Sequence, residues 1–275
     1  MCVRNDAIYL RSALAALIDE GLDVVLIDHD SSEPTRALAR RYLGRGLLGI
    51  ERLPWRGRFS LAEQLEAKRR VAAQVDHDWI VHVDADEWLS APHEGQTLLD
   101  GLRAADEAGF NCVNFNELVF VPRPGEDLFA PNYRARSLRY YFYRPLYPFL
   151  MRAWKKDAGL DNRTFAGHLL TGDVRMCPLD FPLRHYIVLS EAHAARKYAT
   201  RHFDAAEIRL GWHQDRVLAQ ESGAAFPADD ALHRLAHWSS KDFDLSAPRA
   251  RHFWEWDAPE HAGERARIDE RSRAV

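Results

Sequence analysis

The sequence predicts an α/β fold built on a mostly parallel sheet. A continuous apolar run at residues 24–27 and a mostly apolar run at 79–83 are typical of strands that are covered on both faces. Segments with the apolar spacing of helices separate these runs, and the connections between them are short. Strands that alternate with helices in this way favour right-handed βαβ units, so we expect helices on both faces of one sheet.

The composition, with 47% hydrophobic and 28% charged residues, is that of an ordinary soluble protein. Its 275 residues suffice for one sizeable α/β domain with elaborations, or for two small domains that share a core. The net charge of −4 gives no electrostatic basis for nucleic-acid binding. No stretch approaches the roughly 18 to 20 apolar residues of a transmembrane segment. No signal-peptide stretch follows the N-terminus, and we therefore expect a cytoplasmic protein.

The first elements follow from local signals. Val3 ends a short strand, and Asp6 precedes a helix whose apolar stripe ends before Gly21. A second strand at 24–27 runs directly into Asp28 and further polar, capping-prone residues, and Pro34 then suits the first turn of a helix that reaches Gly44. Two strands of the predicted sheet therefore end beside acidic residues.

A third strand is expected at residues 49–53, and the capping box at residues 60–63 opens the next helix. That helix carries Lys68 and Arg69 near its middle and leads into the strand at 79–83. Three carboxylates follow this strand within four residues, at Asp84, Asp86 and Glu87.

This acidic ending predicts a cation site. Asp84 and Asp86 are two residues apart, so an extended backbone points both to the same side, where they can share a hard divalent cation. Ligands of open α/β sheets collect beyond the carboxyl ends of the strands, which is where this motif lies. The alternative is a solvated acidic turn, or a helix N-terminus held by Asp86 or Glu87.

The second half of the chain gives weaker signals. We expect a helix at 94–108, a strand at 112–121 that carries Glu117, and strands at 149–154 and 183–188. Prolines and aromatic residues fill 122–149, which is equally typical of a binding surface and of an irregular packed subdomain.

Ser190 is expected to cap a long helix that passes Lys197 and runs towards Trp212, and residues 259–275 form a charged tail that we expect to be mobile. The expected organisation is an α/β half at 1–120, a second half of the same domain at 121–215, and a helical extension and tail at 216–275. The three cysteines are odd in number and widely separated, which predicts buried free thiols at Cys2, Cys112 and Cys177.

Three stretches together resemble the family 2 glycosyltransferases of GT-A fold. They are Val3-Arg4-Asn5-Asp6, the polar segment at 28–35, and the Asp-x-Asp-Glu segment at 82–89, which agree with the family in order and spacing. His185 and Tyr186, followed by Ser190 and Lys197, resemble the later part of the family pattern more loosely. Asp6 stands where the family usually has Glu, and the segment at 28–35 also departs from the usual motif.

The resemblance makes 1–120 the nucleotide-sugar-binding half and 121–215 the acceptor-side half of the same domain, and it implies roles for individual residues. Asp86, with Asp84, would hold Mn²⁺ or Mg²⁺, and His168 resembles a histidine that some relatives contribute to the metal or the diphosphate. Asp28 would contact the nucleobase, flanked by the backbone of Val3, Arg4 and Asn5, and Lys68 or Arg69 would reach the base or the phosphates. The alternatives are that Asp28 is a helix-capping residue, that the basic pair is solvated helix surface, and that His168 is structural.

The implied activity is metal-dependent transfer of a sugar from a nucleotide-sugar donor, most suitably a UDP-hexose, to a carbohydrate or glycan-precursor acceptor, with inversion. The first candidate for the base that takes the acceptor proton is Asp173, in a polar turn after Gly172, and Glu117 is the alternative. Two other functions stay open. One is a nucleotidyltransferase on a similar sheet, although the sequence has no glycine-rich phosphate loop. The other is a catalytically silent module that binds carbohydrate or a partner.

Overall fold

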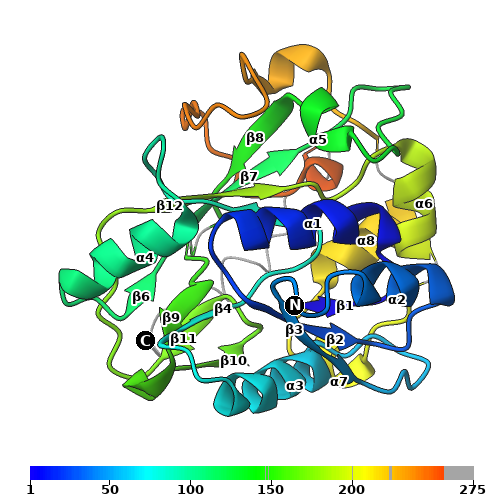
Figure 1. Cartoon of the computed structure of the whole chain (residues 1–275). Coiled ribbons are helices and arrows are strands. Elements are labelled where there is room, and N and C mark those ends of the chain that lie inside the picture. Colours follow the sequence, from blue (N-terminus) through cyan, green and yellow to red (C-terminus); the bar gives the residue numbers. More distant parts are fainter. Residues whose placement is uncertain (146, 148, 200, 223–224, 257–275) are drawn as a thin grey trace.

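A computed structural model describes residues 1–145, 147, 149–199, 201–222 and 225–256. The chain forms a mixed α/β structure, which confirms the predicted fold class (Figure 1). The helices are α1 (Ala7–Asp19), α2 (Glu33–Arg40), α3 (Leu61–Gln74), α4 (Leu98–Glu107), α5 (Tyr133–Arg136), α6 (Glu191–Ala199), α7 (Ala205–Arg209) and α8 (Gln214–Ser222), with 3-10 turns η1 (Lys156–Ala158), η2 (Asp229–Ala231) and η3 (Phe253–Glu255).

The strands are β1 (Cys2–Val3), β2 (Val24–Asp28), β3 (Leu47–Arg52), β4 (Trp79–Val81), β5 (Glu87–Leu89), β6 (Cys112–Val113), β7 (Phe115–Phe120), β8 (Arg139–Tyr143), β9 (Ala153–Lys155), β10 (Asp161–Phe165), β11 (Leu169–Thr171), β12 (Phe181–His185) and β13 (His233–Arg234). Strands β1, β2 and β3 pair in parallel, with α1 and α2 as the crossovers. Cys2 of β1 also forms a parallel bridge to Asp84. The backbone after β4 therefore lies beside β1, and both run toward the same edge of the sheet.

The largest sheet is mixed and has the order β13-β8-β7-β12-β5. Within it β7 and β12 are parallel, whereas the other neighbouring strands are antiparallel. Strands β4, β9 and β6 form a smaller antiparallel sheet. The parallel pattern expected from the sequence thus describes β1–β2–β3 and β7–β12. The pairs β12–β5, β7–β8 and β13–β8 are antiparallel.

The sheet also joins the three predicted segments of the chain. Strand β5 comes from the first segment and pairs with β12 of the second, and β13 of the third pairs with β8. The predicted tail at 259–275 lies outside the described residues. Within the described part of the chain, no helix has both the length and the apolar character needed to cross a bilayer.

Several element boundaries differ from the expectation. The long helix expected after Ser190 consists of α6 and α7, because Phe203 forms a β-bridge with Phe59 and so interrupts helical geometry. The helix expected from residue 94 starts at Leu98, where Thr97 and Asp100 form a reciprocal capping box. The strand expected at 112–121 is divided into β6 and β7, which belong to different sheets.

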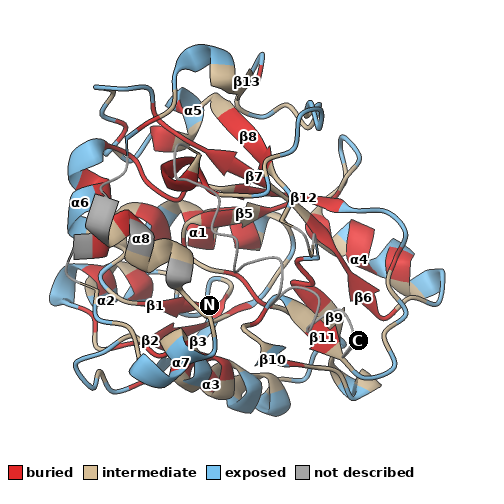
Figure 2. Ribbon diagram, turned by 180° about the vertical axis from the view of Figure 1, so that it is seen from behind, coloured by how far each residue is buried: buried red, intermediate tan, exposed pale blue. Residues whose placement is uncertain are grey.

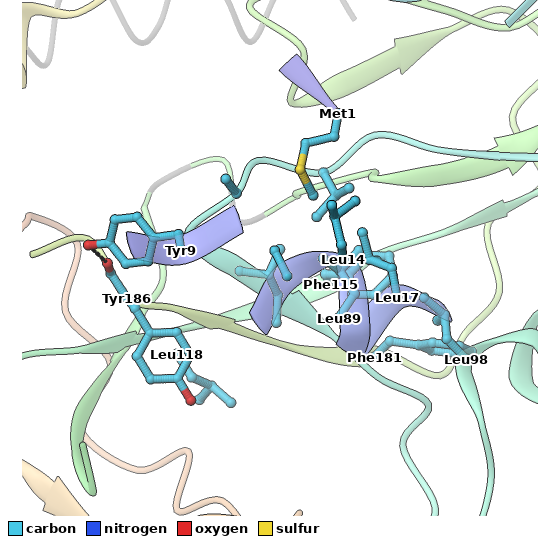
Figure 3. Packing of buried hydrophobic residues seen from close by; sticks show 14 of the residues in the cluster. Met1, Tyr9, Leu14, Leu17, Leu89, Leu98, Phe115, Leu118, Phe181 and Tyr186 are labelled. Carbon is cyan, nitrogen blue, oxygen red and sulfur yellow. Dashed lines mark hydrogen bonds between the residues drawn. The ribbon is translucent and has the colours of Figure 1, made fainter. Parts of the chain in front are cut away.

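Helix α1 lies between the β1–β2–β3 sheet and the largest sheet (Figures 1 and 2). Its apolar stripe, including Leu14 and Leu17, is buried in the main core with Leu89 of β5 and Phe115 of β7 (Figure 3). The hydroxyl of Tyr9 donates to the carbonyl oxygen of Tyr186 at 2.7 Å. The predicted buried free thiols are confirmed at all three cysteines.

Candidate active site

A cavity of about 1810 Å³ opens where the ends of β1 and β4 face the helices of the C-terminal part. One wall contains Val3, Arg4 and Asn5 together with Asp84 and Asp86. Another wall contains residues of α6 to α8. Residues from the first, middle and last parts of the sequence thus meet around one space: Asp6, Trp55, Glu87, Glu117, His168, His185, Lys197, Arg201, Asp215 and His252 also line it.

Asp84 is the accessible carboxylate of the acidic motif. Its side chain is 43% exposed, and Oδ1 accepts a hydrogen bond from Lys68 Nζ at 3.1 Å. Its backbone amide donates to Oε2 of Glu87 at 2.9 Å, which fixes the tight turn of the motif. Desolvation raises the pKa of Asp84, but the charges of Lys68 and Arg152 outweigh it and hold the pKa at about 2. Asp84 is therefore ionised at neutral pH.

Asp86 is more enclosed, with a side chain that is 14% exposed. Lys197 Nζ donates to Asp86 Oδ2 at 2.6 Å, and His185 Nε2 lies 3.6 Å from the same oxygen. Desolvation raises the pKa of Asp86, yet the charges of Lys197 and His185 outweigh it and hold the pKa well below its usual range. The two carboxylates of the motif thus have different partners, one on α3 and one on α6.

Glu117 and His185 extend this charged group onto the largest sheet. Their strands, β7 and β12, are parallel neighbours, and His185 Nδ1 donates to Glu117 Oε1 at 2.6 Å. Burial lowers the pKa of His185, but Asp86 and Glu117 raise it to about 10, so the imidazole is protonated at neutral pH. Glu117, Asp86 and their cations therefore form a continuous chain of ion pairs. No local pattern predicts the Glu117–His185 contact, because it depends on the order of the strands in the sheet.

Glu87, the third acidic residue of the motif, has a structural role. Its side chain is 2% exposed and accepts a hydrogen bond from Arg152 at 2.6 Å. Desolvation raises the pKa of Glu87, opposed by the charge of Arg152. A buried carboxylate needs a charged or hydrogen-bonding partner, and the Arg152 guanidinium supplies one to Glu87 beside the cavity.

The two basic residues predicted on α3 are separated by the fold. Lys68 turns inward and contacts both Asp84 and the ring of His82. Arg69 points away from the cavity, is 51% exposed, and pairs with Glu66 one turn earlier. Of the two, only Lys68 contacts the acidic motif, and neither residue is part of the cavity lining.

The first predicted motif lines the cavity. The guanidinium of Arg4 donates to the carbonyl oxygens of His29 and Asp30 and lies 3.9 Å from the centre of the Trp55 ring. Asn5 adopts a positive φ of 60° and accepts a hydrogen bond from the amide of Ser32. These contacts build a rigid wall from three loops.

Asp28 lies behind this wall and does not line the cavity. It is buried, and its Oδ1 accepts a hydrogen bond from the amide of Ser31 at 3.0 Å. That contact is typical of a carboxylate that shapes a turn. Asp28 thus shapes the turn that leads into α2, whose N-cap position is held by Ser32 rather than by Asp28.

The structure does not bring Asp173 to the cavity. Asp173 is exposed in the turn after β11, and its backbone carbonyl accepts a hydrogen bond from the Asn111 side chain. His168 does line the cavity, where it is exposed, and desolvation among the surrounding side chains together with the charge of Arg152 lowers the pKa of its imidazole. His168 is thus a neutral imidazole at physiological pH. Glu117, the other candidate base, is at the cavity but bound to His185.

The acidic motif suits only a cation whose ligands are partly supplied from outside the protein. Among the described residues, no group of three His, Cys, Asp or Glu side chains is arranged to hold a metal ion. Asp86 is enclosed by Lys197 and His185, which leaves Asp84 as the most accessible ligand. Mg²⁺ and similar cations are commonly held by one or two carboxylates together with substrate phosphates and water. The donor set fits that arrangement.

Residues 201–213, which we call the strap, close one side of the cavity. Phe203 pairs with Phe59 in a β-bridge, and Glu207 accepts hydrogen bonds from Ser60 Oγ and from the amides of Leu61 and Ala62, at 2.8 to 3.0 Å. The carboxylate of Glu207 thus caps the N-terminus of α3 from a distant part of the chain. The sequence predicted that a helix begins at residues 60–63, but it did not predict that Glu207 caps it.

The strap also brings Arg201 to the cavity. Its guanidinium lies 4.9 Å from the centre of the Phe59 ring, and no ion pair to it is found among the described residues. Among the other cations that line the cavity, Arg152, Lys197 and Arg216 are bound to carboxylates, and Arg4 donates to backbone carbonyl oxygens. Arg201 is therefore a cavity cation that can receive an external anion.

Comparisons with known proteins give a distant likeness. No family model matches the sequence, and no curated protein matches it. Among solved structures, S. aureus TarS aligns with 80% of this chain at a TM-score of 0.42 and 14% identity, and this chain spans 41% of that structure's length. TarS 1–349 in complex with UDP aligns at 0.43 and 12% identity, covering 80% of this chain and 69% of that one. TarS 1–349 aligns at 0.42 and 13%, covering 80% and 77%. A likeness this weak assigns neither family nor function.

Proposed function

We propose that the protein is a metal-dependent glycosyltransferase that moves a sugar from a nucleoside-diphosphate donor, of UDP type, to a carbohydrate or glycan-precursor acceptor with inversion. The observation that supports this most is the meeting of separate motifs at one cavity. Residues 3–6, residues 84–87 and the pair His185 and Lys197 all line it, although they are up to 194 positions apart. Residues 3–6 and 84–87 belong to two of the three stretches on which the resemblance to family 2 glycosyltransferases rests, and His185 and Lys197 belong to its later, looser part. The third stretch, at 28–35, supplies no residue to the cavity lining.

The size of the cavity is consistent with two substrates. Typical ligand pockets have volumes of about 300 to 1,000 Å³. The cavity of about 1810 Å³ exceeds that range, so a donor and an acceptor sugar can be present together. A binding module for one small ligand does not need this space.

The nucleoside is proposed to lie against the wall formed by Val3, Arg4 and Asn5, next to the Trp55 ring. Backbone groups and a flat indole suit a planar base with polar edges. Asp28 would support this wall through its bond to Ser31 rather than touch the base.

The diphosphate is proposed to lie between Asp84 and Arg201. A divalent cation held by Asp84, with Asp86 and His168 nearby, would neutralise the negative charge that develops on the departing diphosphate. Lys68 holds Asp84 in place, and Arg201 offers charge-assisted hydrogen bonds to phosphate oxygens. These residues orient the donor so that its anomeric carbon faces the acceptor side of the cavity.

The test is incubation of the purified protein with a panel of nucleotide sugars and MnCl₂, with the released nucleotide product identified by chromatography. Release of nucleoside diphosphate supports the proposal. Release of pyrophosphate would instead identify a nucleotidyltransferase, and UDP binding in calorimetry without any turnover would identify a binding module. The configuration of the product at the anomeric carbon, read by NMR, tests inversion.

A further inference from the structure

We propose that Asp215 is the catalytic base that takes the acceptor proton, and that His252 is the positioning residue that orients it. This inference rests on the proposed glycosyltransferase function and deepens it. Neither residue was a candidate from the sequence, since Asp215 and His252 stand in the least patterned part of the chain. Both line the cavity.

The argument begins with the carboxylates that line the cavity. A base needs an ionised side chain that the acceptor hydroxyl can approach. Glu87, Asp86 and Glu117 are 2%, 14% and 15% exposed, and each is bound to a buried or half-buried cation. Asp84 is accessible, but it belongs to the acidic motif at the proposed diphosphate end.

The remaining lining carboxylates, Asp6 and Glu255, are engaged by the local backbone. Asp6 accepts a hydrogen bond from the amide of Arg4, and Glu255 accepts one from the amide of His252. Asp215 has a side chain that is 32% exposed and lies in the first turn of α8, facing the cavity. It is thus the accessible lining carboxylate outside the acidic motif, among the residues that the structure describes.

The surroundings of Asp215 hold it in a defined orientation. Arg216 Nε lies 3.2 Å from Asp215 Oδ2, and the Arg216 guanidinium is itself fixed by the hydroxyl of Tyr198 and the ring of Trp254. His252 Nε2 lies 3.9 Å from the same carboxylate oxygen. Two nitrogen groups on rigid supports therefore face one side of the carboxylate.

His252 is positioned in turn by aromatic residues. Its ring stacks on Tyr143 with centres 4.1 Å apart, and Tyr141 Oη lies 2.9 Å from its Nδ1. Burial, aided by the charge of Arg216, lowers the pKa of His252 to about 3, so the ring is neutral. When Tyr141 Oη donates to Nδ1, the ring proton is on Nε2, the nitrogen that lies 3.9 Å from Asp215 Oδ2. Because the His252 ring is neutral, it adds no positive charge beside Asp215 that would oppose the transfer of a proton to this carboxylate.

Asp215 lines the same cavity as Asp84, Glu117 and His168. In the proposed step the acceptor O–H bond breaks, and its proton passes to an oxygen of Asp215. The acceptor oxygen forms a bond to the anomeric carbon, the bond from that carbon to the diphosphate oxygen breaks, and its electron pair leaves with the nucleoside diphosphate.

The experiment compares Asp215→Asn with Asp230→Asn, an exposed aspartate outside the cavity that matches it in charge change. UDP affinity is measured by calorimetry with MnCl₂, and turnover is measured as UDP released from UDP-glucose. Asp215→Asn is expected to bind UDP within about two-fold of the unaltered protein and to lose at least the roughly 100-fold in turnover that removal of a general base costs. Asp230→Asn is expected to match the unaltered protein in both measurements.

A structural role is separated from a catalytic one by pH profiles. The turnover of His252→Gln is expected to fall less than that of Asp215→Asn, with the acid limb of its pH profile displaced and UDP affinity kept. Wild-type turnover in a folded Asp215→Asn protein would overturn the inference, and so would an equal loss of UDP affinity and turnover. If Asp215→Asn fails to fold, the same comparison is made with Asp215→Glu, which keeps the charge but moves it. Absence of both UDP binding and UDP release in the unaltered protein would overturn the proposed function and this inference together.

Discussion

The imidazole of His185 lies between two carboxylates, with Nδ1 2.6 Å from Glu117 Oε1 and Nε2 3.6 Å from Asp86 Oδ2. The pair Glu117 and His185 comes from neighbouring parallel strands, and Asp86 comes from the turn before β5. A cation is thereby fixed at the floor of the cavity. Its effect on stability is testable.

The first prediction concerns pH. The pKa of His185 is raised from 6.5 to about 10 on folding, so the stabilisation from its charge is fully present below about pH 6.5 and is lost as pH rises to about 10. We expect the free energy of unfolding to fall across this window. In His185→Gln that part of the pH dependence should disappear. Urea unfolding at several pH values checks it, and identical slopes for both proteins would contradict the charged state of His185.

The second prediction separates the two aspartates of the acidic motif. Asp86→Ala leaves Lys197 and His185 without their carboxylate, and we expect a loss of about 3 to 5 kcal/mol in the free energy of unfolding, as for a broken buried ion pair. Asp84 is 43% exposed, so Asp84→Ala should change stability by less than about 1 kcal/mol. Denaturant unfolding of both variants measures this difference.

Asp84→Ala also tests the proposed metal dependence. Asp84→Ala is expected to lose the increase in UDP affinity that MnCl₂ gives over EDTA, while it keeps the fold. Calorimetry with each additive provides the readout. If UDP affinity in the unaltered protein does not depend on Mn²⁺ or Mg²⁺, the proposed metal dependence is wrong, and the cations around the motif must neutralise the diphosphate by themselves.

The third prediction concerns Arg201. We expect Arg201→Ala to weaken the binding of both UDP and pyrophosphate by about 10-fold or more, because a hydrogen bond to a charged group contributes about 1.5 to 3 kcal/mol. Arg69→Ala is the matched control, since Arg69 is exposed and faces away from the cavity. Equal affinities for the two variants would exclude Arg201 from the diphosphate site.

The fourth prediction concerns the strap. Glu207→Gln replaces a charged acceptor that three donors of the α3 N-terminus share, and we expect about 1 to 3 kcal/mol of local destabilisation. Amide hydrogen exchange should then increase at Leu61, Ala62 and residues 203–213. The control Glu33→Gln lies on the exposed surface of α2 and should leave exchange in these segments unchanged. Unaltered exchange in Glu207→Gln would show that the strap is held by its aromatic contacts instead.

The local features of the fold were readable from the sequence. Residues such as Ser60, which caps α3, and the apolar run that forms β2 act on their immediate neighbours, so pattern alone predicts them. The position of Asp84 and Asp86 directly after a strand is also a property of adjacent residues. The sequence therefore determined the α/β class, the order of the N-terminal elements and the candidate motif.

The tertiary structure decided which charges meet. Asp86 pairs with Lys197, which is 111 positions away in the sequence. Asp215 lines the cavity and Asp173 does not. Both facts depend on the order of the strands and on the contacts that hold the strap. The base role of Asp173 stays a sequence prediction that Asp173→Asn tests. Ion pairs and cavity walls form between segments that no periodicity connects, and packing alone selects them. For that reason the sequence alone determined the acidic motif, whereas only the folded chain decided which side chains contact it.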